Sequence, residues 1–182
     1  MAPRHQSGFS LIEVMIAVVV LSLGLLGVAG LQLSSVRNTQ GSYLRSQAVV
    51  YMNDLAERIY SNSPGVLTYS SYTNVGNCAA PAQICAREST TGTVPAVCTP
   101  AQMATYDLFA VACGMPNGTG RAGGVVNALP GGQLQTTCTA PCTATTPITI
   151  TVNWTDTGSS GNSNANAQSA GTPQVITLVV QP

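Results

Sequence analysis

Lysine is absent from this chain of 182 residues, and charged residues of every kind make up only 7% of it. Six arginines and six acidic residues give a formal net charge of zero. Because a few scattered cations cannot form a basic patch, the composition argues against nucleic acid as a partner. The polar surface must come from asparagine, glutamine, serine, threonine and glycine, a balance typical of exported bacterial proteins that are rich in strands.

Histidine is nearly absent too, since His5 is the only one. Beyond the first few residues the chain therefore has no imidazole for general-base catalysis. Glu88, Asp107 and Asp156 are isolated in the sequence, and we expect each at the surface or at a helix cap. Asp156 alone supplies too few carboxylates for a calcium site, and no glycine-rich phosphate loop follows a predicted strand. The sequence predicts no active site, no cofactor and no metal.

Charge is also missing from most of a long apolar segment near the N-terminus. Residues 9–31 would form a helix of roughly 34 Å at about 1.5 Å per residue, enough to cross a hydrocarbon core of about 30 Å. Glu13 is the only charged residue in this segment. A lone carboxylate in an apolar helix is costly, so it needs a partner or a function. Arg4 and the amino terminus favour a cytoplasmic location for the preceding end.

Three interpretations of this segment compete. It could be a secretory signal peptide cleaved after Gly30, a plain transmembrane anchor, or a signal that is cut just before the apolar residues and leaves them attached. Residues 8–13, Gly-Phe-Ser-Leu-Ile-Glu, resemble the type IV pilin signature, in which a glycine, a phenylalanine and a glutamate stand at fixed spacing before an apolar run. This resemblance implies that a prepilin peptidase cleaves after Gly8 and that Phe9 becomes the methylated N-terminus.

The same resemblance gives Glu13 a role in assembly. Cleavage would create an ammonium group on Phe9, one helical turn before Glu13. The two groups could pair within one chain, because side chains at i and i+4 share a helix face. The family implies instead that Glu13 pairs with the Phe9 amine of a neighbouring subunit. A misplaced subunit would leave two charges unpaired, so this contact would set the axial register of a filament.

Helical periodicity continues beyond the apolar segment. An apolar stripe recurs at steps of three and four residues and consists of Leu44, Ala48, Tyr51, Leu55 and Ile59. We expect one helix over residues 9–61, ended by Pro64 and Gly65, with Asp54 and Arg58 forming an i,i+4 pair. Gly24, Gly27 and Gly30 would either let this helix bend or allow close packing of neighbouring helices.

The six cysteines all follow the helical segment; they are Cys78, Cys85, Cys98, Cys113, Cys138 and Cys142. An even number beyond a membrane anchor predicts up to three disulfides in an oxidising compartment. Free buried thiols and a zinc site are alternatives, although the spacing from Cys138 to Cys142 lacks a second close pair. Among fifteen possible pairings, we favour the local ones, Cys78–Cys85, Cys98–Cys113 and Cys138–Cys142.

The remaining sequence predicts a small head. Residues 62–98 are irregular, with at most short strands. A hydroxyl cap at Thr99 and a proline at position 100 start a helix that runs to about residue 111, followed by a loop over residues 114–124. Strands are expected at residues 132–138, 148–154 and 174–181. Residues 155–172 should form a mobile exposed loop, a spacer rather than a binding loop.

These elements indicate an α+β fold, in which a long N-terminal helix packs on a small antiparallel sheet. We divide the chain into a leader (1–8), an apolar helix (9–31), its amphipathic continuation (32–61) and a disulfide-stapled head (62–182). Three stretches of the chain, residues 21–32, 129–132 and 152–156, also resemble the PilV-type minor pilins.

That second resemblance implies a low-copy structural subunit that primes or modifies type IV pilus assembly. Its partners would be other minor pilins, the major pilin, the prepilin peptidase, the inner-membrane assembly platform and membrane lipid. The chain would span the bacterial inner membrane once, with its head in the periplasm, and then join the filament. Alternatives are a minor pseudopilin of a type II secretion system, an adhesin or DNA-uptake pilin, and a tethered enzyme.

Overall fold

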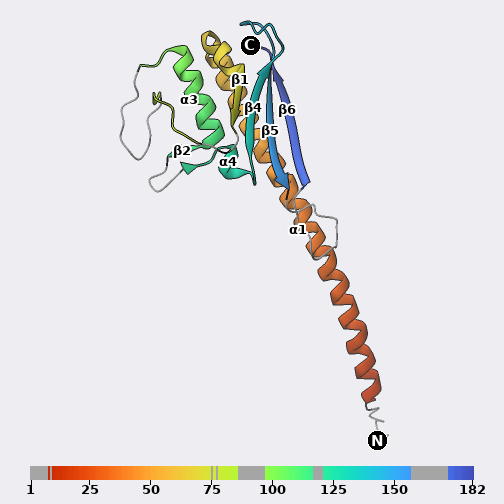
Figure 1. Cartoon of the computed structure of the whole chain (residues 1–182). Coiled ribbons are helices and arrows are strands. Elements are labelled where there is room, and N and C mark those ends of the chain that lie inside the picture. Colours follow the sequence, from red (N-terminus) through yellow and green to blue (C-terminus); the bar gives the residue numbers. More distant parts are fainter. Residues whose placement is uncertain are drawn as a thin grey trace, which may run out of the picture. The chain divides into compact units, whose positions relative to one another are not determined.

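A computed structural model of the chain describes residues 8, 10–74, 76, 78–85, 97–116, 121–156 and 172–182. In chain order the elements are α1 (Leu11–Ser61), η1 (Ser63–Gly65), α2 (Val66–Tyr69), β1 (Ser71–Asn74), α3 (Pro100–Cys113), β2 (Met115–Pro116), β3 (Arg121–Ala122), α4 (Val125–Ala128), β4 (Gln133–Cys138), β5 (Ile148–Asp156) and β6 (Thr172–Val180). One long helix and a four-stranded antiparallel sheet confirm the predicted α+β class (Figure 1). The chain divides into a first unit, Met1–Thr39, and a second unit, Gln40–Pro182.

Helix α1 is continuous over 51 residues and contains no proline. It ends at Ser61, as predicted, where the chain passes into the 3₁₀ turn η1 with Pro64 inside it. Glu13 in the first turn and Arg58 in the last turn both suit the helix dipole. The predicted apolar stripe is confirmed in the second unit, where Ala48, Leu55 and Ile59 are fully buried.

The sheet has the order β1-β4-β5-β6, and every neighbouring pair is antiparallel. Strand β5 shows why its sequence alternates, since Ile148, Ile150, Val152 and Trp154 point into the core while threonines and Asn153 stand on the other face. The three predicted strands are confirmed with ends that differ by one or two residues. The four-residue strand β1 completes the sheet by pairing with β4.

Helix α3 begins as its sequence predicts. The Thr99 hydroxyl accepts a hydrogen bond from the Gln102 backbone N–H, and the Thr99 N–H donates to Oε1 of Gln102 at 2.8 Å, which forms a capping box. The helix runs two residues further than expected, to Cys113. Gly114 follows with φ of 75°, against the backbone of residues 122 and 123, so a side chain there would be both strained and crowded.

Other short elements were not predicted. Residues 63–69 form η1 and α2, where we expected irregular chain, and β2 and β3 form a small hairpin within the expected loop over residues 114–124. Helix α4 was also missed. These segments are too short for hydrophobic periodicity to reveal them. The predicted mobile loop falls on residues 157–171, which lie outside the described residues, while its two ends belong to β5 and β6.

The cysteines form three disulfides, so the alternatives of free thiols and a zinc site are wrong. The pairs are Cys78–Cys113, Cys85–Cys98 and Cys138–Cys142, with Cα–Cα separations of 5.6, 5.8 and 5.8 Å. The last pairing confirms the prediction, and the other two predicted pairings are incorrect. Cys113 is fully buried at the end of α3, where Asn74 of β1 donates to its sulfur. Tertiary packing therefore decides its partner, which sequence distance does not reveal.

Candidate assembly segment

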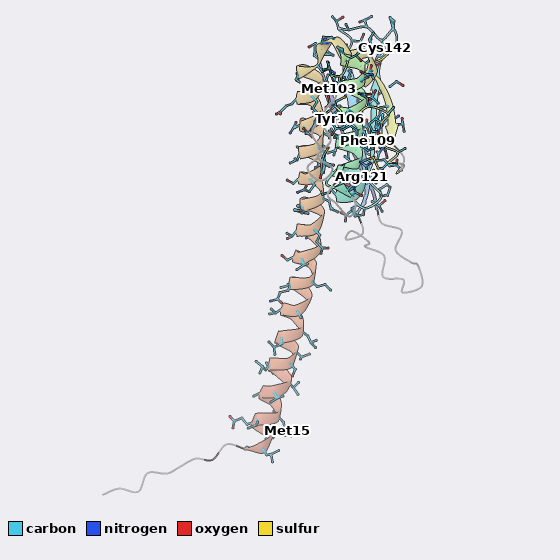
Figure 2. All side chains as sticks on the ribbon, turned by 90° about the vertical axis from the view of Figure 1, so that its left-hand side faces the viewer. Met15, Met103, Tyr106, Phe109, Arg121 and Cys142 are labelled. Carbon is cyan, nitrogen blue, oxygen red and sulfur yellow. A yellow bond between two sulfur atoms is a disulfide. The ribbon has the colours of Figure 1, made fainter. Side chains whose placement is uncertain are left out.

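Nearly all of the apolar side chains that the structure describes in the first unit are exposed. Large hydrophobic residues of α1 from Leu11 (77% exposed) to Leu31 (74%) and Val36 have no core to enter (Figure 2, in which Met15 is labelled). Soluble monomers rarely present so large a continuous apolar surface, so lipid or other helices must cover it. By length and composition alone, α1 could cross a membrane, with a mean hydropathy of 2.7 in its most apolar window.

Glu13 lies at the very start of this apolar surface. Its backbone N–H donates to the Ser10 carbonyl at 3.0 Å, and the Val14 N–H reaches the same oxygen at 3.4 Å, which closes the first helical turn. The carboxylate is exposed in this single chain, among apolar neighbours. Phe9, its predicted partner group, lies outside the described residues. Pairing, cleavage and methylation at this end therefore remain predictions.

Gly8 is placed by the structure, and its surroundings are open. A Cβ atom added there would meet nothing within 4 Å. The chain's own fold therefore gives no reason for glycine at this position. A requirement for glycine at position 8 would have to come from a molecule that recognises the segment, as a peptidase would.

Gly24, Gly27 and Gly30 are equally open, with nothing within 4 Å of an added Cβ at any of them. Helix α1 passes through all three positions without a break. Small residues on an exposed apolar helix let another backbone approach closely. Ser22, the hydroxyl residue just before them, donates to the Val18 carbonyl at 2.6 Å, so its polar group is satisfied within the helix.

In the second unit, two acids and one arginine meet at the C-terminal end of α1. Arg58 donates to Asp54 at 3.0 Å, which confirms the predicted i,i+4 pair, and to Asp107 of α3 at 2.8 Å. The Tyr69 hydroxyl donates to the second oxygen of Asp107 at 2.5 Å. Asp107 is only 5% exposed, so our expectation of a surface or cap position is wrong. Its partners lie 49 and 38 residues away in the sequence, so no local sequence pattern indicates that Asp107 is buried.

Asp54, Arg58, Tyr69 and Asp107 form one hydrogen-bonded cluster that holds helices of the head together. Burial, together with the hydrogen bond to Asp107, raises the pKa of Tyr69 above its usual value, so the hydroxyl stays protonated and donates. Asn62 also donates to the Tyr69 oxygen at 3.3 Å and to the Pro100 carbonyl at 2.8 Å. Both carboxylate oxygens of Asp107 are engaged by neighbours. The network therefore ties α1, α2 and α3 together and leaves no group of Asp107 free for a substrate.

The other isolated acids give no metal site within the described part of the chain. Asp156 is partly buried at the end of β5, near Gly41 of α1. The two residues after it, like Glu88, are outside the described ranges. Over the residues that the structure places, no group of three or more histidine, cysteine, aspartate or glutamate side chains could hold a metal ion.

Two family models match the chain. The prokaryotic N-terminal methylation motif matches residues 3–29, and a model described as type IV pilin Tt1218 matches residues 30–109. The two matches are consecutive and together cover more than half of the sequence. No curated protein and no solved structure matches it. A methylation motif at the start of an exposed apolar helix, followed by a pilin domain, identifies this chain as a member of the type IV pilin family.

Proposed function

We propose that this protein is a minor type IV pilin, a low-copy structural subunit that primes or modifies pilus assembly. The observation that carries the proposal is the exposed apolar half of α1 with a single carboxylate, Glu13, at its beginning. Such a helix is stable only in lipid or among other helices. A filament core made of like helices offers the second of these environments.

The proposed mechanism is structural. The subunit waits in the inner membrane with its head in the periplasm, and the prepilin peptidase removes residues 1–8. The new amino group on Phe9 is positively charged near neutral pH. Glu13 of an incoming subunit then pairs with the Phe9 amine of a subunit already in place. In a medium of low dielectric, an uncompensated charge costs several kcal/mol, so only the correct axial position is favourable.

Partners follow from this cycle. The peptidase and the inner-membrane assembly platform act on the membrane-bound form, membrane lipid covers the apolar helix before assembly, and other minor pilins and the major pilin surround it afterwards. No nucleic acid is expected, because the chain has six arginines, no lysine and a formal net charge of zero, and Arg58 is engaged by Asp54 and Asp107.

The minor, PilV-type assignment rests on sequence resemblance, and one contact adds to it. The turn at residues 129–132 and the strand end at residues 152–156 are two of the resembling stretches. The Thr155 N–H donates to the Pro130 carbonyl at 2.8 Å, so the two stretches meet in the fold. The turn and the strand end therefore belong to one structural feature. Both of its sequence stretches resemble the PilV-type minor pilins, and both support that assignment.

The assembly role is tested by Glu13→Leu. We expect this variant to be cleaved and inserted in the membrane, but its amount in sheared filaments should fall at least tenfold, since a lost pairing of more than about 1.4 kcal/mol has that effect. Glu57→Leu, at an exposed acid later in the same helix, is the matched control and should assemble normally. Equal incorporation of both variants would remove Glu13 from the mechanism.

The processing role is tested by Gly8→Asp. We expect intact-mass measurement to show that this variant retains the leader. The protein without the substitution should instead lack residues 1–8 and carry a methyl group. A Gly8→Asp product of normal mature mass would refute the cleavage site.

If normal filaments formed without the protein while type II secretion failed, the pseudopilin alternative would replace the pilus.

A further inference from the structure

Strand β6 is an edge strand with little of the usual protection, because Pro173 near its start is the one protective feature among its residues. Within the part of the chain that the structure describes, it pairs with β5 on one side only and is the outermost strand of the sheet (Figure 1). Its nine residues include no charged residue, and its pairing with β5 is continuous, without a bulge. Natural sheets normally shorten, charge, bulge or cover such an edge, because its free N–H and C=O groups invite another strand. The opposite edge, β1, has only four residues.

A groove of about 400 Å³ runs beside β6. Helix α1 forms one wall, with Arg45, Val49, Met52 and Asn53, and residues 175–178 of β6 form the other. Ile176 and Leu178 pack partly against the core, while Val175 is 59% exposed on the opposite face of the strand. Successive residues of β6, whose side chains lie on opposite faces of the strand, thus line the groove, which means that it follows the strand's edge.

Arg45 gives the groove its charge. Arg45, Val49 and Asn53 follow one another at steps of four, so they form one row on α1. Arg45 is exposed and makes no ion pair with any residue that the structure describes, unlike Arg58. The groove therefore combines apolar residues such as Val49 and Ile176, the outer edge of β6 and one guanidinium without an ion pair among the described residues, which suits a carboxylate.

Resting on the proposed function, we propose that β6 accepts an extended segment of a different pilin subunit as an added strand. Main-chain hydrogen bonds would join the segment to β6, its alternate apolar side chains would lie against Ile176 and Leu178, and one carboxylate would bind Arg45. Strand addition of this kind draws affinity from the backbone and specificity from alternate side chains. The contact would let this subunit select its neighbour through the head, in addition to any selection by the helix.

A second copy of this chain fits the groove less well. Pairing of β6 with β6 of another copy would bring no acid to either Arg45, because β6 contains none. Two guanidinium groups would then remain unsatisfied near the interface. Charge complementarity thus favours a partner with an acidic residue in its added strand.

The test is photo-cross-linking in the full-length protein, in cells that assemble filaments. p-Benzoylphenylalanine replaces Val175, which lines the groove, and in a control replaces Gln133, which stands in the same cross-strand row on the inner strand β4. We expect the Val175 probe to form an adduct with an acid-containing peptide of another pilin, at least fivefold more than the Gln133 probe. Arg45→Ala should lower this adduct at least fivefold, and Arg45→Lys should largely restore it.

Other results would overturn the proposal. These are an adduct only with a second copy of this chain, an adduct only with lipid or with a protein that is not a pilin, or an adduct that Arg45→Ala leaves unchanged. The thermal unfolding of Arg45→Ala should equal that of the unmodified protein, since Arg45 is exposed and forms no ion pair with any residue that the structure places. If mature protein appears in sheared filaments but Val175 forms no adduct, the strand addition fails while the pilin function stands.

Discussion

Replacing Asp107 by alanine should weaken the head more than any change at an exposed acid. The substitution removes the hydrogen bonds from Arg58 and Tyr69 and leaves the buried Tyr69 hydroxyl without its acceptor. A hydrogen bond to a charged group contributes about 1.5–3 kcal/mol, and an unsatisfied buried group costs about 1–3 kcal/mol. The Arg58 side chain is 35% exposed and keeps Asp54, so its share must be discounted for solvent screening. The net expectation is a loss of about 2–4 kcal/mol.

The assay is urea unfolding of the mature protein in detergent micelles, followed by tryptophan fluorescence. Trp154 is the only tryptophan and is 4% exposed in the core, so its emission reports on the head. With a slope of about 1–3 kcal/mol per molar urea, the midpoint should fall by roughly 1–2 M. Asp54→Ala is the control: it removes the 43% exposed partner of the same arginine and should cost under about 1 kcal/mol.

A double-mutant cycle sharpens this test. Arg58→Ala and Asp107→Ala should be non-additive, with an interaction energy of about 1–2 kcal/mol, because the two side chains share a hydrogen bond. If Asp107→Ala cost no more than Asp54→Ala, or if the cycle gave zero coupling, the buried network would not hold the three helices together.

Two further predictions concern the stability of the head. The pKa of Tyr69 is raised in the folded state by burial and by Asp107, so stability should be complete below pH 10 and should fall as pH rises from there toward the folded-state pKa. Tyr69→Phe should flatten much of that alkaline decline in urea midpoints, whereas Tyr60→Phe, at an exposed site, should not; equal slopes would contradict the assignment. Removing the Cys78–Cys113 disulfide, which spans 35 residues, should cost about 4 kcal/mol, against about 2 kcal/mol for Cys138–Cys142, which spans four. Equal losses would contradict the loop-length argument.

Local patterns in the sequence predicted the parts of the fold that depend on neighbours in the chain. The alternation in β5 and the capping box at Thr99 are set within a few residues, and both elements form where expected. The methylation motif was recognisable for the same reason, since Gly8, Phe9 and Glu13 stand within six positions, while the roles of these three residues remain predictions. Their chemistry requires only a helix and an apolar surrounding.

Features that join distant segments were not predictable in this way. The partner of Cys113 is set by the packing of α3 beside β1, and the burial of Asp107 is set by Arg58 and Tyr69 from other helices. The groove has the same origin, because Arg45 meets a strand that lies about 130 residues later. A single sequence shows that these residues are polar or reactive, but only the fold shows which of them meet.

The two halves of α1 are stabilised by different surroundings, and this difference leads to a last prediction. Between residues 11 and 36 the helix exposes apolar side chains all round, and only surroundings outside the chain can cover them. From Ala48 to Ile59 one stripe is buried by the chain's own sheet and α3, so this half is stabilised within the head. Changes in the two halves should therefore act independently, as distant sites without shared partners do.

Glu13→Leu and Asp107→Ala test this independence directly. Glu13→Leu should leave the urea midpoint of the head unchanged to within about 0.5 kcal/mol, and Asp107→Ala should leave leader removal and membrane insertion intact. The double variant should show both defects at their separate sizes. A head destabilised by Glu13→Leu would mean that the acid supports folding of the subunit, and its place in the assembly mechanism would have to be given up, because a folding defect alone would explain the loss of filaments.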